Sequence, residues 1–324
     1  MKKLMTVLLI GLVAASFSAF AEGQAEEMEG EADEQRVVGF SQVDHQNPWR
    51  LAETESIRRV AEERGYTLQF SNAQAVQANQ IKAVRSFIAQ GVDGILLAPK
   101  TSTGWAPVLR EAKEAGIPVV LVDRNVEADP DLVVTFIGSD FVDQGERVAR
   151  QMIEDLGEGP LNVAELQGQP GADPTVDRAE GFRNVVNEYS EIEIILSQTG
   201  EFNRQQGKQV MEAFLQAEGD NIDAVYAHND DMAIGAIQAI EEQGLEPGED
   251  IWIGSIDGVR DIFTELQDGD ANVTVESPPL MGPYGFDALE AAWAGEELDD
   301  WIKIDDEKFT DEEVDQEVIE SRLY

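Results

Sequence analysis

Short runs of Val, Ile and Leu alternate with amphipathic segments along most of the chain, and this alternation limits the fold more than any other feature. Each run is too continuously apolar to leave one face in water, as is typical of parallel strands covered by helices on both faces. The expected strands are residues 37–42, 67–70, 94–98, 118–123, 133–138, 162–166, 193–197, 224–227, 251–256 and 272–276. The pattern predicts an α/β fold.

The number of strands bears on how many domains the chain forms. Its 324 residues exceed what one hydrophobic core usually holds. A TIM barrel would need eight strand–helix units in one ring, whereas the expected strands are more numerous and divide into two groups near Gly138. Two doubly wound parallel-sheet domains are therefore predicted. Neither a GxGxxG turn nor a GxxxxGK[ST] loop follows any strand, so no nucleotide cofactor is expected.

The N-terminal segment predicts export. Lys2 and Lys3 precede an apolar run at residues 4–17, and Ala19-Phe20-Ala21 forms a small-x-small cleavage site, so residues 1–21 are expected to be a signal peptide. The chain has no Cys, which excludes a lipid-modified N-terminal cysteine. Residues 22–35 carry seven carboxylates and little to bury, and are predicted to be a disordered acidic leader. A periplasmic protein without a lipid anchor is expected.

Charge excludes some classes of partner. The chain has 65 acidic and 23 basic residues, giving a formal net charge of −42. Such a surface repels nucleic acid and anionic membranes, so neither is an expected partner. We hypothesise that the charge is an adaptation to high salt, where screening removes the self-repulsion. With no Cys and only two His, no metal site is predicted.

Polar residues at the ends of the first group of strands mark a candidate site, because ligands of open α/β sheets bind beyond the carboxyl ends of the strands. Gln42 ends the first strand, and Trp49-Arg50 follow it. An aromatic face beside a guanidinium suits a sugar; the alternative is that Trp49 is a hydrophobic staple at a helix start and Arg50 is solvated. Asp123-Arg124 end the fourth strand, either to bind hydroxyls or as a salt bridge capping the sheet.

The second group of strands adds further polar groups. Asn229, Asp257 and Glu276 follow three of its strands, and Arg178 and Phe202 lie on its remaining strand-end loops. His228 fits a structural role as well as a ligand contact, and Asp230 is expected to cap the helix that starts at residue 231. Carboxylates, an amide, guanidinium groups and two aromatic rings together make the inventory of a neutral polyol site.

Several stretches carry a resemblance to a known family. They are GFSQ at residues 39–42, QIKAVRSF at 80–87, TGW at 103–105, VDR at 122–124, YAHNDDM at 226–232 and GSIDG at 254–258. In this order and spacing they resemble the type I periplasmic sugar-binding proteins, the ribose and galactose binders, and most of all the galactofuranose-binding type. The resemblance runs from about residue 37 to about residue 293.

The resemblance implies that the chain crosses between its domains three times in a hinge. The crossings are expected near Gly138, Pro278 and Leu298. The N-terminal sugar-binding lobe would then be residues 36–138 plus 278–298, and the C-terminal lobe residues 139–277 plus 299–324.

The resemblance also assigns roles to the candidate residues. Asp123 and Arg124 match an Asp-Arg pair that binds sugar hydroxyls from the N-terminal lobe. The residues that would close over the sugar from the other lobe are Arg178, Phe202, Asn229 and Asp257. Glu276 stands where ribose binders have Gln, and Trp49-Arg50 agree with the galactofuranose type.

The function that the resemblance implies is capture of a monosaccharide by hinge closure and its delivery to the membrane subunits of an ABC importer, by a monomer without cofactor. A sugar sensor for a chemoreceptor or sensor kinase stays open as an alternative. A glycosidase using Asp123 and Asp257 is the enzymatic alternative. Neighbouring arginines are expected to keep both acids ionised and so leave no general acid, which argues against it.

Overall fold

The computed structural model describes residues 35–322 and residue 324. The predicted signal peptide, and the predicted acidic leader up to residue 34, lie outside the described residues. Within the described part of the chain, no helix is both long and apolar enough to cross a membrane.

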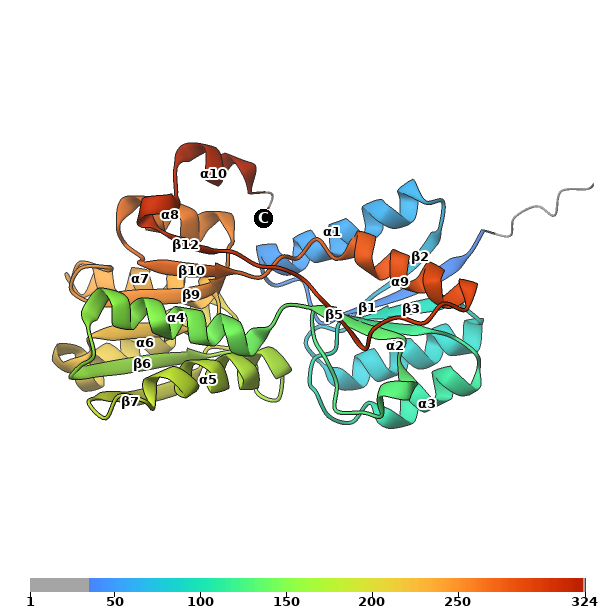
Figure 1. Ribbon diagram of the computed structural model, residues 1–324, viewed down its shortest axis with the longest axis horizontal. Coiled ribbons are helices and arrows are strands. Elements are labelled where there is room, and N and C mark those ends of the chain that lie inside the picture. Colours follow the sequence, from blue (N-terminus) through green and yellow to red (C-terminus); the bar gives the residue numbers. More distant parts are fainter. Residues whose placement is uncertain (1–34, 323) are drawn as a thin grey trace, which may run out of the picture. The chain divides into compact units, whose positions relative to one another are not determined.

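The first sheet is parallel throughout and has the order β11-β5-β4-β3-β1-β2. Figure 1 labels β1, β2, β3 and β5 of this sheet. Helices α1 (Pro48–Glu63) and α9 (Gly282–Ala294) pack together, and so do α2 (Gln77–Gln90) and α3 (Ala106–Glu114). Its strands are β1 (Val37–Gln42), β2 (Thr67–Asn72), β3 (Gly94–Leu97), β4 (Val119–Val122), β5 (Thr135–Gly138) and β11 (Trp301–Lys303). We call this sheet with its four helices the first lobe.

The second sheet has the order β12-β10-β9-β8-β6-β7 and is parallel except for β12, which runs antiparallel to β10. Its strands are β6 (Leu161–Gln167), β7 (Ile192–Thr199), β8 (Ala224–Ala227), β9 (Trp252–Asp257), β10 (Val273–Glu276) and β12 (Lys308–Thr310). Its helices are α4 (Phe141–Leu156), α5 (Asp173–Val186), α6 (Arg204–Glu218), α7 (Asp230–Glu242), α8 (Arg260–Asp268) and α10 (Gln316–Ser321). Together they form the second lobe.

Both faces of each sheet are buried, as the continuous apolar runs predicted. On β3, Leu96 packs in one core cluster while Ile95 and Leu97 pack in another, because successive side chains of a strand point to opposite faces. The second sheet repeats this arrangement, with Val225 and Tyr226 of β8 in different clusters. The predicted α/β class with two parallel-sheet domains is confirmed.

The chain passes between the lobes at residues 139–140, 277–281 and 304–307. The sequence placed the third passage near Leu298, but β11 lies beyond that point and pairs with β5, so residues 301–303 belong to the first lobe. β11 and β12 were not predicted, because each has only three residues and lacks a strand-length apolar run.

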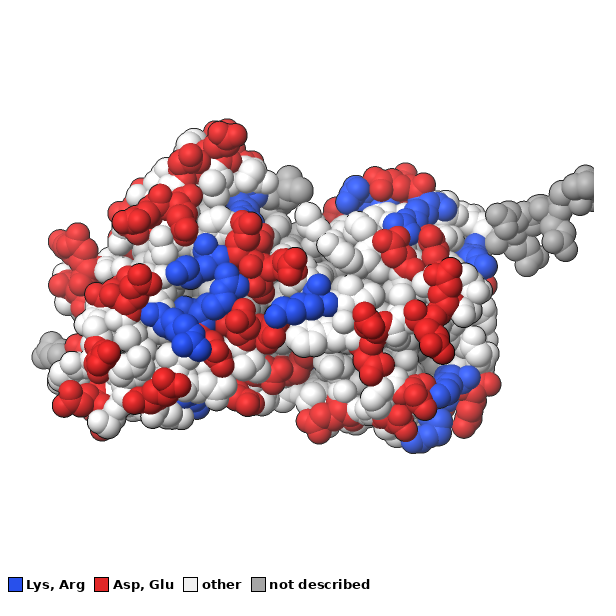
Figure 2. Space-filling model, viewed as in Figure 1, with Lys and Arg blue, Asp and Glu red and all other residues white. Residues whose placement is uncertain are grey.

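Acidic side chains are spread over both lobes on the face shown in Figure 2, and basic side chains form smaller groups among them. Many of these basic groups are paired with an acid. Arg147 lies 2.5 Å from Asp306, and Lys303 lies 3.0 Å from Asp140. The negative charge of the sequence is therefore a property of the folded surface.

Candidate functional site

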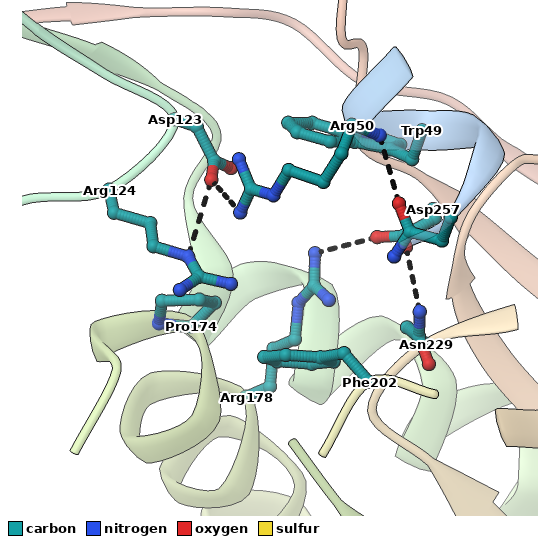
Figure 3. Close-up of a pocket in the computed structure, with 10 residues that line it drawn as sticks. Trp49, Arg50, Asp123, Arg124, Pro174, Arg178, Phe202, Asn229 and Asp257 are labelled. Atoms are coloured by element: carbon teal, nitrogen blue, oxygen red, sulfur yellow. Dashed lines mark hydrogen bonds and ion pairs between the residues drawn. The ribbon is translucent and has the colours of Figure 1, made fainter. Parts of the chain in front are cut away.

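One pocket collects polar side chains from both lobes at the carboxyl ends of the strands (Figure 3). Its empty space, open solvent included, is about 310 Å³. The lining residues are Asn47, Trp49, Arg50, Asp123, Arg124, Pro174, Arg178, Phe202, Asn229 and Asp257. The structure thus brings together the predicted site residues except Gln42 and Glu276.

The start of α1 supplies an aromatic ring and a guanidinium. Asn47 caps the helix by accepting a hydrogen bond from the Arg50 backbone N–H at 2.9 Å. Pro48 occupies the first turn, where a backbone N–H would have no partner within the helix, so the missing N–H of proline costs nothing. The Arg50 guanidinium lies 4.7 Å from the centre of the Trp49 ring. The indole Nε1 of Trp49 donates to the carbonyl of Ser277 at 2.5 Å, which ties the ring to the second passage between the lobes.

Asp123 and Arg124 continue from the end of β4 into the pocket. Asp123 has a φ of 66°, a left-handed conformation that few non-glycine residues adopt, and its Oδ2 lies 2.5 Å from Arg50 Nη2. Arg124 Nε lies 3.3 Å from the same oxygen. Burial, and then the charge of Arg50, lower the pKa of Arg124 to about 10. One carboxylate is thus shared by two guanidinium groups.

The second lobe contributes a buried cluster around Asp257. Arg178 Nη2 donates to Asp257 Oδ1 at 3.2 Å, and Asn229 Nδ2 donates to Asp257 Oδ2 at 3.3 Å. Arg178 also donates to the carbonyl of His228 at 2.5 Å. Asp257 has a φ of 133°, again in the region that favours glycine. Arg178, Asn229 and Asp257 are therefore held in place by one another.

The expectation that arginines keep both acids ionised is wrong for Asp257. Burial raises the pKa of Asp257 to about 7, although the nearby Arg178 lowers it. The ion pair exists as expected, but the desolvation of a fully buried carboxyl outweighs it.

Phe202 forms the wall of the pocket on the second-lobe side. Trp49 and Phe202 lie on opposite sides of the charged groups in Figure 3. The Phe202 ring packs directly on the backbone of Gly168, where a Cβ would lie only 2.0 Å from the ring. Arg124 lies 5.5 Å from the centre of the Phe202 ring, so this ring contacts a group of the other lobe.

The lobes also touch beside the pocket. Arg124 Nη1 donates to Gln169 Oε1 at 3.1 Å, and the backbone N–H of Asn125 donates to Asp173 Oδ2 at 2.7 Å. These contacts join the loop after β4 to the start of α5, so the pocket is bordered by direct bonds between the lobes.

Two predicted residues lie elsewhere. Gln42 is buried beneath α1 and donates to Glu53 and Thr54. Glu276 is bound by the C-terminal segment, where it pairs with Arg322 and accepts a hydrogen bond from the Tyr324 hydroxyl at 3.2 Å. Neither side chain lines the pocket.

Other residues differ from the predictions in smaller ways. Asn47 and Pro174 line the pocket without having been predicted; an Asn-Pro pair and an Asp-Pro pair at helix starts were the available signals. The cap of α7 is Asn229, which accepts from Met232 N, and not Asp230, which is buried against Ser255. His228 is buried and bonds Glu165, so its ring has a structural role. No group of three metal-binding side chains occurs among the described residues.

Comparison with known proteins identifies the family. Residues 38–297 match the periplasmic binding protein domain family. The chain is 52% identical over 257 residues to the galactofuranose-binding protein YtfQ of Escherichia coli (strain K12), covering 78% of this chain and 81% of that protein. It is 34% identical to the ribose import binding protein RbsB of Bacillus subtilis (strain 168), over 81% of this chain and 83% of that protein.

Solved structures agree with the sequence relatives. A crystal structure of a galactofuranose binding protein superimposes with a TM-score of 0.86 at 46% identity, covering 89% of this chain and 98% of that chain. The periplasmic component of an arabinose ABC transporter from Shewanella sp. ANA-3, bound to α- and β-L-arabinofuranose, gives a TM-score of 0.85 at 47% identity over 88% of this chain and 95% of that chain. These relatives are solute-binding proteins, not enzymes, and this chain belongs to the periplasmic binding protein family.

Proposed function

We propose that this chain binds a monosaccharide in its furanose form between its two lobes. The observation that carries the proposal is the composition of the pocket, which places three guanidinium groups and two carboxylates between two aromatic rings. Guanidinium groups donate to hydroxyl oxygens and carboxylates accept from hydroxyl hydrogens. The rings offer flat faces for the C–H groups of a sugar.

The charge balance of the pocket favours a neutral ligand over an anionic one. Asp123 pairs with Arg50 and Arg124, and Asp257 pairs with Arg178, so each guanidinium already has a carboxylate partner. A sugar acid or sugar phosphate would have to compete with these partners, whereas hydroxyl groups can use the remaining donors and acceptors.

The ring form is proposed from the relatives. Two of the most similar proteins are a galactofuranose-binding protein and an arabinofuranose-bound protein, at 52% and 47% identity. The ribose import relative is less similar, at 34%.

The proposed role is delivery of the bound sugar to an ABC importer in the periplasm. Ligand that contacts both lobes binds the closed arrangement more tightly than the open one and shifts the population towards it. The three passages between the lobes would serve as the hinge. The importer would then recognise surfaces from both lobes of the closed form.

The binding proposal is tested by thermal unfolding of the purified chain in concentrated salt, with galactose, L-arabinose, ribose, glucose and a methyl galactopyranoside locked in the six-membered ring. A sugar at about 100 times its Kd stabilises the folded state by about 2.7 kcal/mol. We expect stabilisation by galactose or arabinose, none by the locked pyranoside, and loss of the effect in Asp123→Asn. Glu111→Gln, in an exposed ion pair with Arg85, is the matched control. A folded chain that none of the free sugars stabilises would refute the proposal.

Delivery is tested separately in cells. Removing the membrane subunits of the cognate importer should abolish uptake of the sugar while leaving binding by the purified chain intact. Unchanged uptake in such cells would contradict the delivery role and favour a sensory one.

A further inference from the structure

Helix α1 carries a carboxylate that does not line the pocket yet bonds a residue that does. Glu53 lies one turn after Arg50 and its side chain is fully buried. Its Oε2 accepts from Arg50 Nη1 at 2.8 Å. An acid this deeply buried is unusual unless it is paired, and the ion pair with Arg50 supplies that partner.

Gln42 holds Glu53 in place from the neighbouring strand. Its Nε2 donates to Glu53 Oε2 at 2.8 Å and to Thr54 Oγ1 at 3.1 Å. Its own Oε1 accepts from the Val43 backbone N–H at 2.8 Å, which fixes the orientation of the amide. The end of β1 therefore anchors the acceptor oxygen of Glu53.

Arg50 is consequently held from two sides. Nη1 is bonded to Glu53 behind the pocket, and Nη2 lies 2.5 Å from Asp123 Oδ2 in the pocket. With both of these nitrogens engaged, the guanidinium plane is fixed above the Trp49 ring. Without Glu53, Arg50 would keep the Trp49 ring and the Asp123 carboxylate as neighbours, and that carboxylate is shared with Arg124.

We infer that Glu53 is a positioning residue for the ligand site, which holds Arg50 in its binding orientation and so raises the affinity for the sugar. This inference rests on the proposed function. Gln42, which was predicted as a site residue, supports the pocket indirectly by holding Glu53.

The charge state of Glu53 gives the inference a pH signature. Burial, with a smaller contribution from the charge of Asp123, raises the pKa of Glu53 to about 7, although Arg50 and Gln42 lower it. Asp123, Asp44 and His45 are further titratable groups near this cluster. His45 Nε2 lies 3.2 Å from Thr54 Oγ1, and burial and Arg58 lower the pKa of His45. Below neutral pH, Glu53 gains a proton and its bond to Arg50 loses the charge assistance.

The test compares the chain with Glu53→Gln, which keeps the shape and removes the charge. At about pH 8.5 the variant should bind the sugar about tenfold more weakly, the loss typical of one charge-assisted hydrogen bond. The difference should shrink towards none at about pH 5.5, where Glu53 itself is protonated. Asp257 titrates in both proteins and cancels in the ratio of their affinities. Glu63→Gln, in an exposed pair with Arg59 on the same helix, should change nothing.

A second readout does not need the ligand. The guanidinium NMR signals of Arg50, assigned with Arg50→Lys, should be sharp in the parent chain and broadened in Glu53→Gln at about pH 8.5. Glu53→Asp, which shortens the acid but keeps its charge, should give intermediate affinity and serves if the glutamine variant does not fold.

Equal affinities at every pH, or a loss that stays constant with pH, would overturn the inference, because a merely structural role does not follow the protonation of Glu53. If the parent chain binds no sugar, the proposed function fails and the NMR signals decide. Broadening then supports the positioning of Arg50 by Glu53, and unchanged signals refute it.

Discussion

Arg178 and Asp257 form an ion pair inside the second lobe, with Nη2 and Oδ1 3.2 Å apart and both side chains buried. Arg178 comes from α5 and Asp257 from the end of β9, so the pair joins two elements that are far apart in the sequence. Asn229 fixes the second oxygen of Asp257. This half of the pocket is thus built within one lobe and needs no contact from the other.

The raised pKa of Asp257 predicts a pH-dependent stability. The folded chain holds the proton more tightly than the unfolded chain, so the group favours folding at low pH, and this contribution is lost as the pH rises from 3.8 to about 7. The amide of Asp257→Asn does not titrate, so the variant has no such loss of stability as the pH rises. We expect the variant to gain roughly 1–3 kcal/mol of unfolding free energy relative to the parent between about pH 4 and pH 8, measured with denaturant. A constant difference between the two proteins would contradict the raised pKa.

Gly168→Ala should weaken sugar binding although residue 168 does not line the pocket. Its Cβ would lie 2.0 Å from the Phe202 ring and must push the ring out of position. We expect roughly a tenfold loss of affinity by titration calorimetry, as for a lost aromatic contact. Gly219→Ala, whose nearest contact would be 3.9 Å away, is the matched control. Unchanged affinity would mean that Phe202 does not contact the ligand.

Arg322→Ala separates stability from binding. Arg322 pairs with Glu276 and lies 4.6 Å from the Phe263 ring and 4.7 Å from the Phe309 ring. Its loss should lower the unfolding free energy by about 1–3 kcal/mol and leave sugar affinity unchanged, because Glu276 is outside the pocket. Arg85→Ala, in an exposed pair, should cost less than about 0.5 kcal/mol. Weaker sugar binding by Arg322→Ala would indicate that Glu276 takes part in ligand binding after all.

The net charge of −42 predicts that salt stabilises the fold. At low ionic strength the acids repel one another, and added salt screens that repulsion over about 10 Å at 0.1 M. We expect the unfolding temperature to rise as KCl is added up to molar concentrations. A temperature that falls over the same series would remove the case for a high-salt habitat.

The sequence predicted the sheets well, because each central strand is an uninterrupted apolar run and buried parallel strands require such runs. The pocket could be predicted from the same runs, because Asp123 and Asp257 stand at their carboxyl ends. Asn47 could have been found as the cap before a proline.

Glu276 could not have been separated from Asp257 by the same reasoning. Each acid is the last residue of a buried strand of the second sheet. What distinguishes them is the segment near the C-terminus, where Arg322 and Tyr324 lie 46 and 48 residues further along and take the carboxylate. A partner so distant leaves no local pattern at Glu276 itself. Gln42 shows a similar limit, because a strand end can support a site from behind as well as line it.

Asp123 and Asp257, the two carboxylates of the pocket, both stand on backbone that glycine would adopt more easily, with φ values of 66° and 133°. Strain of this kind typically costs about 1–3 kcal/mol at each position. Glycine at either site would relax the backbone and remove a hydroxyl acceptor in the same step. Under the proposed function, selection for thermal stability and selection for ligand recognition therefore oppose each other at these two positions.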